Sequence, residues 1–218
     1  MPKKFVSWAK YIQLLICLSL LFAININGQE KLSLFGKNLI INGGAEAGEA
    51  AWRGEGFESA RYGSFGDEWD VGVAGAPNGG DSYFRLTVPN SKEVTFAKNI
   101  IDLSRAAEFI DKNPAEVVLS AYIGGSPSQE EKFAVTSLVV NFLDMDKKLL
   151  GLTSIEVKET ELPKAEIGTA SIVLRTKTEK LPKGTAMIEV VLKVKNACPT
   201  CMSIGYADNI SLVLKPVK

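Results

Sequence analysis

The sequence of 218 residues contains no histidine, and this is its most restrictive absence. Without an imidazole the chain has no Ser-His or Cys-His nucleophile pair, no histidine zinc site and no histidine general base. Few classes of enzyme therefore remain. An excess of charge is also absent, because 25 Lys and Arg residues balance 25 Asp and Glu residues. We therefore expect no nucleic-acid partner and no acidic lipid partner.

Long hydrophobic runs are scarce as well, which argues against a multi-span membrane protein. Hydrophobic residues make up 46% of the chain and charged residues 23%. This is ordinary usage for a globular protein and does not indicate intrinsic disorder. We expect one folded domain over residues 29–218.

Residues 1–28 have the layout of a secretory signal peptide. Three lysines within the first ten residues precede the apolar run Tyr11–Ile24, and the polar stretch Asn25–Gly28 follows it. The run of 14 residues is shorter than the length needed to cross a bilayer, which is about 20 residues for a helix. We expect cleavage after Gly28, with Ala23 as the second choice. An uncleaved signal anchor is the weaker alternative.

Removal of this segment leaves 22 basic and 25 acidic side chains, a formal charge of −3. The mature protein is then secreted, periplasmic or held at the cell surface, with no transmembrane segment after cleavage. Cys17 leaves with the signal peptide, so that Cys198 and Cys201 are the two cysteines that remain.

Short segments of alternating apolar and polar residues dominate the mature chain, and clusters of Gly, Pro, Asn and Asp separate them. In Met187–Lys195, the clearest segment, every second residue is aliphatic, which predicts a strand with one buried face. Eight further segments have this character: Asn38–Ile41, Ser82–Val88, Glu93–Ile101, Ala115–Ile123, Ala134–Leu143, Leu149–Val157, Ala170–Thr178 and Tyr206–Leu214. Nine strands with almost no helix between them predict an all-β fold of two packed antiparallel sheets.

Two segments depart from this pattern. Apolar residues recur at helical spacing in Leu103–Ile110, which predicts one short crossover helix that Asp102 or Ser104 caps and Asn113 ends, before Pro114. Ala45–Gly80 is rich in glycine, and we expect it to be loop.

The two ends of the mature chain resemble the first and last strands of galactose-binding-like jelly rolls, the fold of many carbohydrate-binding modules in secreted bacterial proteins. The segments are Asn38-Leu-Ile-Ile-Asn-Gly-Gly-Ala-Glu46 and Gly205-Tyr-Ala-Asp-Asn-Ile-Ser-Leu-Val-Leu214. The pieces between them follow the order that such domains show, so that the resemblance covers residues 38–214. It implies a jelly-roll sandwich. The superfamily includes sugar-binding, protein-binding and membrane-binding domains, so the fold leaves the function open.

The resemblance also implies a structural calcium ion. In similar modules a carboxylate after the first strand and an aspartate on the last strand hold Ca²⁺, and here these positions match Glu46 and Asp208. Calcium takes about six to eight oxygen ligands, so backbone carbonyls near Asn42, Gly44 and Asp81 would have to contribute. The alternative is that Glu46 is an exposed loop acid and that Asp208 caps a turn.

Solvent-facing aromatic side chains are the residues to expect in a sugar site, because flat rings stack on the apolar faces of pyranoses. Strand alternation turns some such side chains outward, and the glycine-rich loop adds others. The candidate ligand-binding residues are Trp52, Tyr62, Trp69, Tyr83, Arg85 and Tyr122. The alternative, favoured for each tryptophan taken singly, is that the indole rings are buried beneath the loop.

The tetrapeptide Cys198-Pro-Thr-Cys201 allows three interpretations. A redox dithiol requires its first cysteine at the start of a helix, whereas β-rich sequence flanks this one. A zinc site requires two further thiolates or imidazoles, which the mature chain lacks. A local disulfide, worth about 2 kcal/mol from chain entropy, suits an exported protein and is favoured.

We therefore expect an exported, non-catalytic protein that binds a glycan or a glycosylated surface through loop aromatics, with a structural calcium ion. A structural or adhesive surface protein that contacts other proteins is the alternative. A small glycan hydrolase is the weaker alternative. The only dense acidic cluster of the chain is Asp67, Glu68 and Asp70, and nothing in the sequence pairs it with a distant carboxylate. The sequence specifies neither the glycan nor the oligomeric state.

Overall fold

The computed structural model describes residues 34–63, 76, 78–126, 134–162, 171–198 and 200–217. The predictions on residues 1–28, on Trp69 and on the cluster Asp67–Asp70 lie outside these residues. In the described part of the chain, no helix combines the length and the apolar character that crossing a membrane requires.

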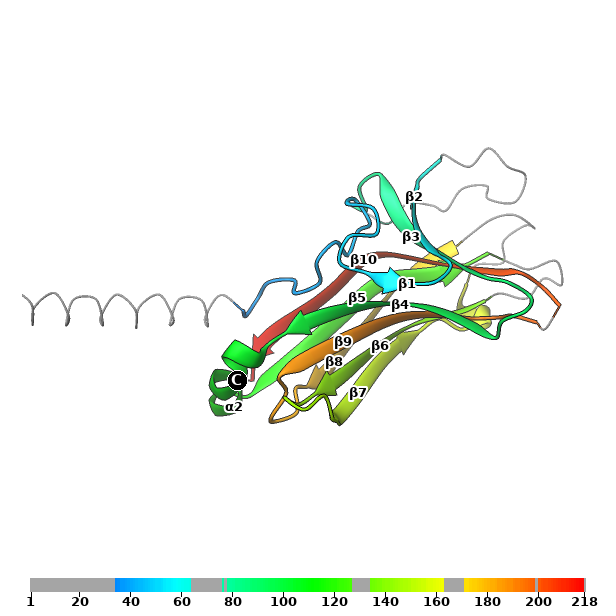
Figure 1. The fold of residues 1–218 in the computed structure, drawn as a ribbon. Coiled ribbons are helices and arrows are strands. Elements are labelled where there is room, and N and C mark those ends of the chain that lie inside the picture. Colours follow the sequence, from blue (N-terminus) through cyan, green and yellow to red (C-terminus); the bar gives the residue numbers. More distant parts are fainter. Residues whose placement is uncertain are drawn as a thin grey trace, which may run out of the picture.

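Two antiparallel sheets of five strands each form the protein, and they pack as two layers (Figure 1). Sheet I has the order β1 (Arg53–Gly54), β4 (Val94–Asp102), β9 (Met187–Lys195), β6 (Val135–Leu143) and β7 (Leu149–Glu156). Sheet II has the order β2 (Phe57–Arg61), β3 (Ser82–Val88), β10 (Ser203–Pro216), β5 (Ala115–Gly125) and β8 (Ser171–Lys180). The all-β jelly-roll sandwich expected from the sequence is confirmed.

The core lies between the sheets and follows from the alternation in the strands. In β9 the residues Ile188, Val190, Leu192 and Val194 are all fully buried, as the period of two predicts. The inward residues of β5, on sheet II, belong to the same apolar cluster. Each sheet therefore buries one face against the other sheet.

Eight of the nine predicted strands are present with small shifts at their ends, and Asn38–Ile41 is the exception. Asn38 makes a single bridge to Val213 of β10, and the chain then turns. The Asn38 side chain takes over the pairing, because its Oδ1 accepts from the N–H groups of Leu212 (2.9 Å) and Ile40 (3.0 Å). A side chain that bonds the backbone competes with a strand ladder, which is why the prediction is wrong here.

The segment expected to be loop contains two short edge strands, β1 and β2. Strand β2 buries Phe57 and Ala60 and pairs with β3, while β1 pairs with β4. Their alternation is too brief and too interrupted by charge and glycine to be visible in the sequence. Edge strands are commonly short and charged, because this discourages pairing with other chains.

The predicted helix is present as a 3-10 turn, Ser104–Ala106, followed by α2 (Ala107–Lys112). Asp102 accepts the N–H of Ser104 at 2.8 Å, but the N-cap residues are Leu103 for the 3-10 turn and Ala106 for α2, so neither Asp102 nor Ser104 is the predicted cap. The helix covers the end of the sandwich at which β10 also ends (Figure 1). There the N–H of Val217 bonds the carbonyl of Pro114 at 2.9 Å.

Trp52 belongs to the core and not to a ligand site. Its side chain is 1% exposed, and its ring centroid lies 5.3 Å from that of Phe84 and 6.1 Å from that of Phe57. The indole Nε1 donates to the carbonyl oxygen of Asn42 at 3.1 Å. A ring with no open face cannot stack on a sugar, so the expectation that Trp52 binds a ligand is corrected.

We predict that Trp52→Ala lowers the free energy of unfolding by about 3–5 kcal/mol, since it removes a buried ring and leaves a cavity. Urea denaturation followed by circular dichroism measures this change. Arg53→Ala is the matched control: Arg53 is the adjacent, exposed residue, and its loss should change stability by less than about 0.5 kcal/mol. Equal stabilities of the two variants would contradict the core assignment.

Candidate functional site

The two predicted metal ligands come together where β10 passes the segment that follows Asn38. Asp208 is fully buried and stands just before an irregularity in the β10–β5 pairing. Glu46 is anchored at the start of β3, because its Oε1 accepts from the N–H groups of Asp81 (3.0 Å) and Ser82 (2.8 Å). The alternative for Glu46 holds in part: its side chain is an exposed acid in a turn, although two backbone N–H groups bond it. The alternative for Asp208 does not hold, because this side chain is buried within β10 and does not cap an exposed turn.

Burial raises the pKa of Asp208 to about 6, and the charge of Glu46 acts in the same direction. Two donors oppose this shift: the Tyr62 hydroxyl donates to Oδ2 at 2.7 Å, and the N–H of Asn209 donates to Oδ1 at 2.6 Å. Burial and the Asp208 carboxylate in turn raise the pKa of the Tyr62 phenol. A buried carboxylate beside a second carboxylate is a place where a cation would relieve both desolvation and repulsion.

Backbone and side-chain oxygens converge on this place. A Cβ atom at Gly44 would lie 3.6 Å from Asp208 Oδ1, 3.8 Å from Asn209 Oδ1 and 4.0 Å from the carbonyl oxygen of Gly79. A Cβ at Gly79 would collide with Asp208 Oδ2, and one at Gly80 would collide with Glu46 Oε1. Glycine is thus required at both positions for the two carboxylates to lie this close to the backbone of Gly79 and Gly80.

These donors fit calcium, which prefers carboxylate and carbonyl oxygens. The described residues contain no group of three or more His, Cys, Asp or Glu side chains that could hold a metal ion. Main-chain carbonyls would therefore have to complete the coordination of an ion held by Glu46 and Asp208.

Four of the predicted ligand residues, Tyr62, Tyr83, Arg85 and Tyr122, lie around the outer face of sheet II. Tyr83 is 3% exposed, and its ring centroid lies 4.8 Å from that of Tyr62 and 5.6 Å from that of Tyr206. Tyr206, which the sequence reasoning missed, is fully buried. The expectation that Tyr83 faces solvent is therefore corrected: it points away from the main core but into a second, smaller cluster.

Arg85 and Tyr122 flank this cluster of tyrosines. The Arg85 guanidinium pairs with Glu58 on β2 at 2.7 Å. Tyr122 is half-buried and stands opposite Asp208 in the pairing of β5 with β10. The structure thus brings these residues together, but the enclosed rings of Tyr83 and Tyr206 offer no stacking surface. The cluster holds Tyr62 in position to donate to Asp208.

The outer face of sheet I is open and carries a second group of residues that the sequence reasoning did not select. We call this face the platform. Its exposed apolar side chains include Val94 (40% exposed), Phe96 (44%) and Ile100 (50%) on β4 and Leu152 (57%) on β7. Strand pairing places Ile100, Glu189, Asn141 and Leu152 in one row across four strands. The sequence did contain a signal for this surface, namely large apolar side chains at outward positions of β4.

A polar network occupies the middle of the platform. The Glu189 carboxylate accepts from Lys98 Nζ at 2.8 Å and from Asn141 Nδ2 at 3.0 Å. Burial alone would raise the pKa of Glu189, but these two hydrogen bonds and the charge of Lys98 lower it overall. Lys98 Nζ also lies 5.5 Å from the centroid of the Phe96 ring. The platform therefore combines apolar surface with an ionised acceptor and two donors held in fixed positions.

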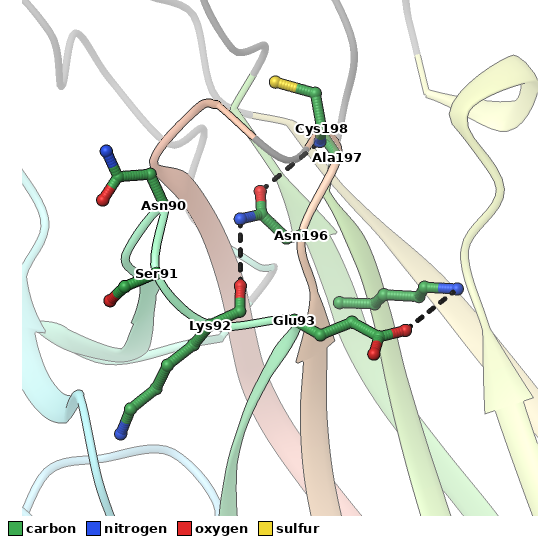
Figure 2. Close-up of a pocket in the computed structure, with 8 residues that line it drawn as sticks. Asn90, Ser91, Lys92, Glu93, Asn196, Ala197 and Cys198 are labelled. Carbon is green, nitrogen blue, oxygen red and sulfur yellow. Dashed lines mark hydrogen bonds and ion pairs between the residues drawn. The ribbon is translucent and has the colours of Figure 1, made fainter.

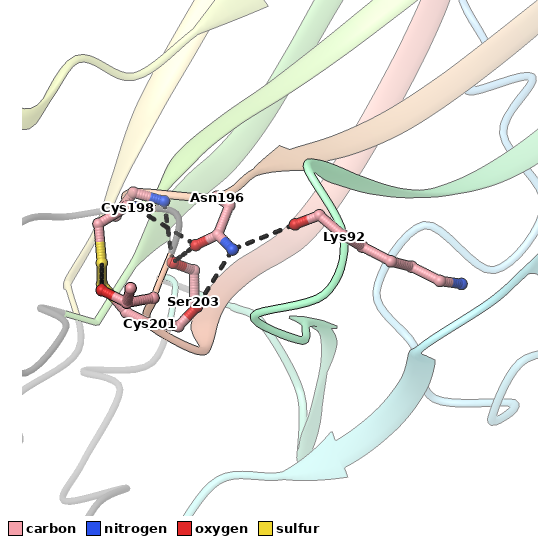
Figure 3. Close-up of a disulfide and its surroundings, with 7 residues drawn as sticks. Lys92, Asn196, Cys198, Cys201 and Ser203 are labelled. Atoms are coloured by element: carbon pink, nitrogen blue, oxygen red, sulfur yellow. Dashed lines mark hydrogen bonds between the residues drawn. A yellow bond between two sulfur atoms is a disulfide. The ribbon is translucent and has the colours of Figure 1, made fainter.

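Cys198 and Cys201 form a disulfide in the loop between β9 and β10, as predicted (Figure 3). Their Cα atoms lie 5.4 Å apart, and both residues are buried.

No protein-family model matches this sequence, and no curated protein matches it. Among solved structures, a family 16 carbohydrate-binding module is 21% identical, with a TM-score of 0.50, and the match covers 81% of this chain and 99% of the module. A family 61 module in complex with β-1,4-galactotriose is 15% identical, with a TM-score of 0.46, 84% of this chain and 100% of that chain covered.

A third match is the enzymatically active domain of tailspike protein 4 from bacteriophage CBA120, 13% identical with a TM-score of 0.49. That match covers 83% of this chain but spans only 21% of the tailspike. The family 16 module establishes that this chain has the jelly-roll fold that carbohydrate-binding modules use.

We predict that the disulfide contributes about 2 kcal/mol to stability, because it closes a short loop in the unfolded chain. Urea denaturation with and without reductant should reveal this difference in the wild type. The double variant Cys198→Ser, Cys201→Ser serves as the control, since its stability should match that of the reduced wild type and should not respond to reductant. An unfolding curve of the wild type that reductant leaves unchanged would contradict the prediction.

Proposed function

We propose that this protein is an exported, non-catalytic carbohydrate-binding protein and that a glycan lies across the platform. The observation that carries the proposal is the juxtaposition of exposed apolar side chains and a fixed polar network on one open sheet face. Sugars present both apolar C–H faces and hydroxyl groups, so their sites need both kinds of surface. The jelly-roll fold shared with a family 16 carbohydrate-binding module supports the proposal.

The network suits the recognition of hydroxyl groups. The ionised Glu189 carboxylate is a strong acceptor, while Lys98 and Asn141 supply donors beside it. Because the three side chains already hold one another, little side-chain freedom is lost when a glycan binds. The exposed ring of Phe96, two residues before Lys98 on β4, supplies a stacking surface.

The platform replaces the loop aromatics as the proposed site. Trp52 and Tyr83 are covered by other side chains, and Trp69 lies outside the described residues.

A binding role without catalysis also accords with the state of Glu189. Glycoside hydrolysis requires one carboxylic acid that carries a proton and a second carboxylate about 5–10 Å away. The pKa of Glu189 is lowered by its donors, so this side chain is an acceptor and not a proton donor at neutral pH.

We further propose that Glu46 and Asp208 hold a structural calcium ion with main-chain carbonyl oxygens. The ion would supply positive charge between two carboxylates that otherwise repel each other. Glu46 is bonded to the start of β3 and Asp208 lies in β10, so the ion would tie the segment around Glu46 to both strands. Export, to the periplasm, the cell surface or the medium, is proposed from residues 1–28 alone.

For calcium, we predict that a chelator lowers the melting temperature of the mature protein and that added Ca²⁺ restores it. At a calcium concentration of 100 times Kd the gain in stability is about 2.7 kcal/mol. Asp208→Asn should abolish the response to calcium, whereas Asp146→Asn, at an exposed aspartate in the turn between β6 and β7, should retain it. Identical melting curves of the wild type with calcium and with chelator would refute the site.

For the glycan, we predict that a glycan array detects binding by the mature protein and that Phe96→Ala weakens it about tenfold. A lost aromatic contact costs about 0.5–1.5 kcal/mol, and 1.4 kcal/mol corresponds to a factor of ten. Leu174→Ala is the matched control, because Leu174 is an exposed apolar residue on sheet II. If the folded, calcium-loaded wild type binds no glycan on the array, a protein-contacting surface role becomes the better account of the exposed apolar residues.

A further inference from the structure

A pocket of about 470 Å³ lies at one end of the platform, between the turn that joins β3 to β4 and the start of the disulfide loop (Figure 2). Asn90, Ser91, Lys92 and Glu93 line it from the turn, and residues 195–198 line it from the other side. Its volume falls within the range of small-molecule sites, about 300–1,000 Å³. It is separate from the Glu46 and Asp208 site, none of whose residues line it.

The pocket is continuous with the platform. Val94, Lys195 and Val135 form the last row of sheet I at this end, and Lys195 also lines the pocket. One step further, the N–H of Asn196 donates to the carbonyl of Glu93 at 2.9 Å and closes the ladder. A chain lying along the strands would therefore reach the pocket where the sheet ends.

Asn196 builds the wall of the pocket (Figure 3). Its Nδ2 donates to the carbonyl of Lys92 in the turn and to the carbonyl of Cys201 in the loop, both at 3.1 Å. Its Oδ1 accepts from the Ser203 hydroxyl at 2.7 Å and from the N–H of Cys198 at 3.4 Å. The Asn196 amide thus joins the turn on one side of the pocket to the disulfide loop on the other side. These hydrogen bonds and the disulfide together fix the separation of the two sides.

Because the Asn196 side chain is fully used, other groups must meet a ligand. Within the described part of the chain, no hydrogen bond engages the Asn90 amide or the Ser91 hydroxyl, and both residues are exposed. Glu93 Oε1 and Lys195 Nζ lie 4.0 Å apart and offset each other's charge. Among the residues that the structure describes, no aromatic side chain lines the pocket. These groups suit a neutral ligand with many hydroxyls that is hydrogen-bonded and not stacked.

We propose that this pocket binds the terminal sugar unit of a neutral glycan whose following units lie on the platform. The inference rests on the proposed function and adds to it: the protein would recognise chain ends as well as chain interiors. An open sheet face accommodates any stretch of a polysaccharide, whereas a pocket bounded by two turns at the end of the sheet accommodates an end.

The test compares short and long probes. We would titrate the wild type with β-1,4-galactotriose, cellotriose, xylotriose and mannotriose by calorimetry, and with the parent polysaccharides by affinity electrophoresis. The double variant Asn90→Ala, Ser91→Ala should weaken binding of the recognised trisaccharide about tenfold, because two hydrogen bonds to the chain end are lost. Binding of the parent polysaccharide should stay within twofold of the wild type, since its interior segments use the platform.

Two controls separate the outcomes. Phe96→Ala should weaken both the trisaccharide and the polysaccharide, and Lys112→Ala, on α2 at the opposite end of β4, should weaken neither. If the pocket variant binds the trisaccharide as tightly as the wild type while Phe96→Ala does not, the pocket proposal is overturned and the platform stands. If the wild type binds none of the probes, the glycan function itself is overturned. Overlapping thermal unfolding curves of the pocket variant and the wild type ensure that the comparison concerns binding.

Discussion

The burial of one face of most long strands against the opposite sheet is the constraint on which the rest of this structure depends. In β9 the aliphatic residues from Ile188 to Val194 face the core, so the intervening residues Met187, Glu189 and Val191 must face the other way. Because side chains alternate with a period of two, the residues that pack in the core also determine which residues lie on the outer face. The platform is thus the necessary counterpart of the core, and a shift of one residue in β9 would bury Glu189.

A second junction joins the segments around Glu46 and Tyr62 to β3 and β10. Asp208 is buried in β10, Tyr62 donates to it from the end of β2, and Glu46 stands beside it while bonded to the start of β3. Burial of Asp208 is the main cost at this junction, and the charge of the exposed Glu46 carboxylate adds to it. This junction lies on sheet II, whereas the proposed glycan surface lies on sheet I. Stability and recognition are therefore assigned to opposite faces of one fold.

The sequence was informative where a single residue pattern sufficed. The alternation in Ser82–Val88 and Met187–Lys195 predicted strands with the observed ends, and the pair of cysteines three positions apart predicted the disulfide. It was misleading where the exposure of a side chain depended on a distant segment. Tyr83 alternates outward as expected, yet Tyr62 and Tyr206 enclose it. Trp52 lies in a glycine-rich segment and packs against Phe57 and Phe84. Its burial therefore depends on strands that the sequence around Trp52 did not predict.

The sequence by itself therefore determined eight of the ten strands, the sandwich and the cysteine pair, while the resemblance to jelly-roll modules supplied the two acids that meet beside β3 and β10. Only the tertiary structure decided which side chains are neighbours on the platform, because Lys98, Asn141 and Glu189 come from three strands whose order in the sheet differs from their order in the chain. It also decided that Asn196 joins a turn more than 100 residues away. Local periodicity specifies which face a residue takes, but lateral contact follows from strand order and register, which many separate segments settle together.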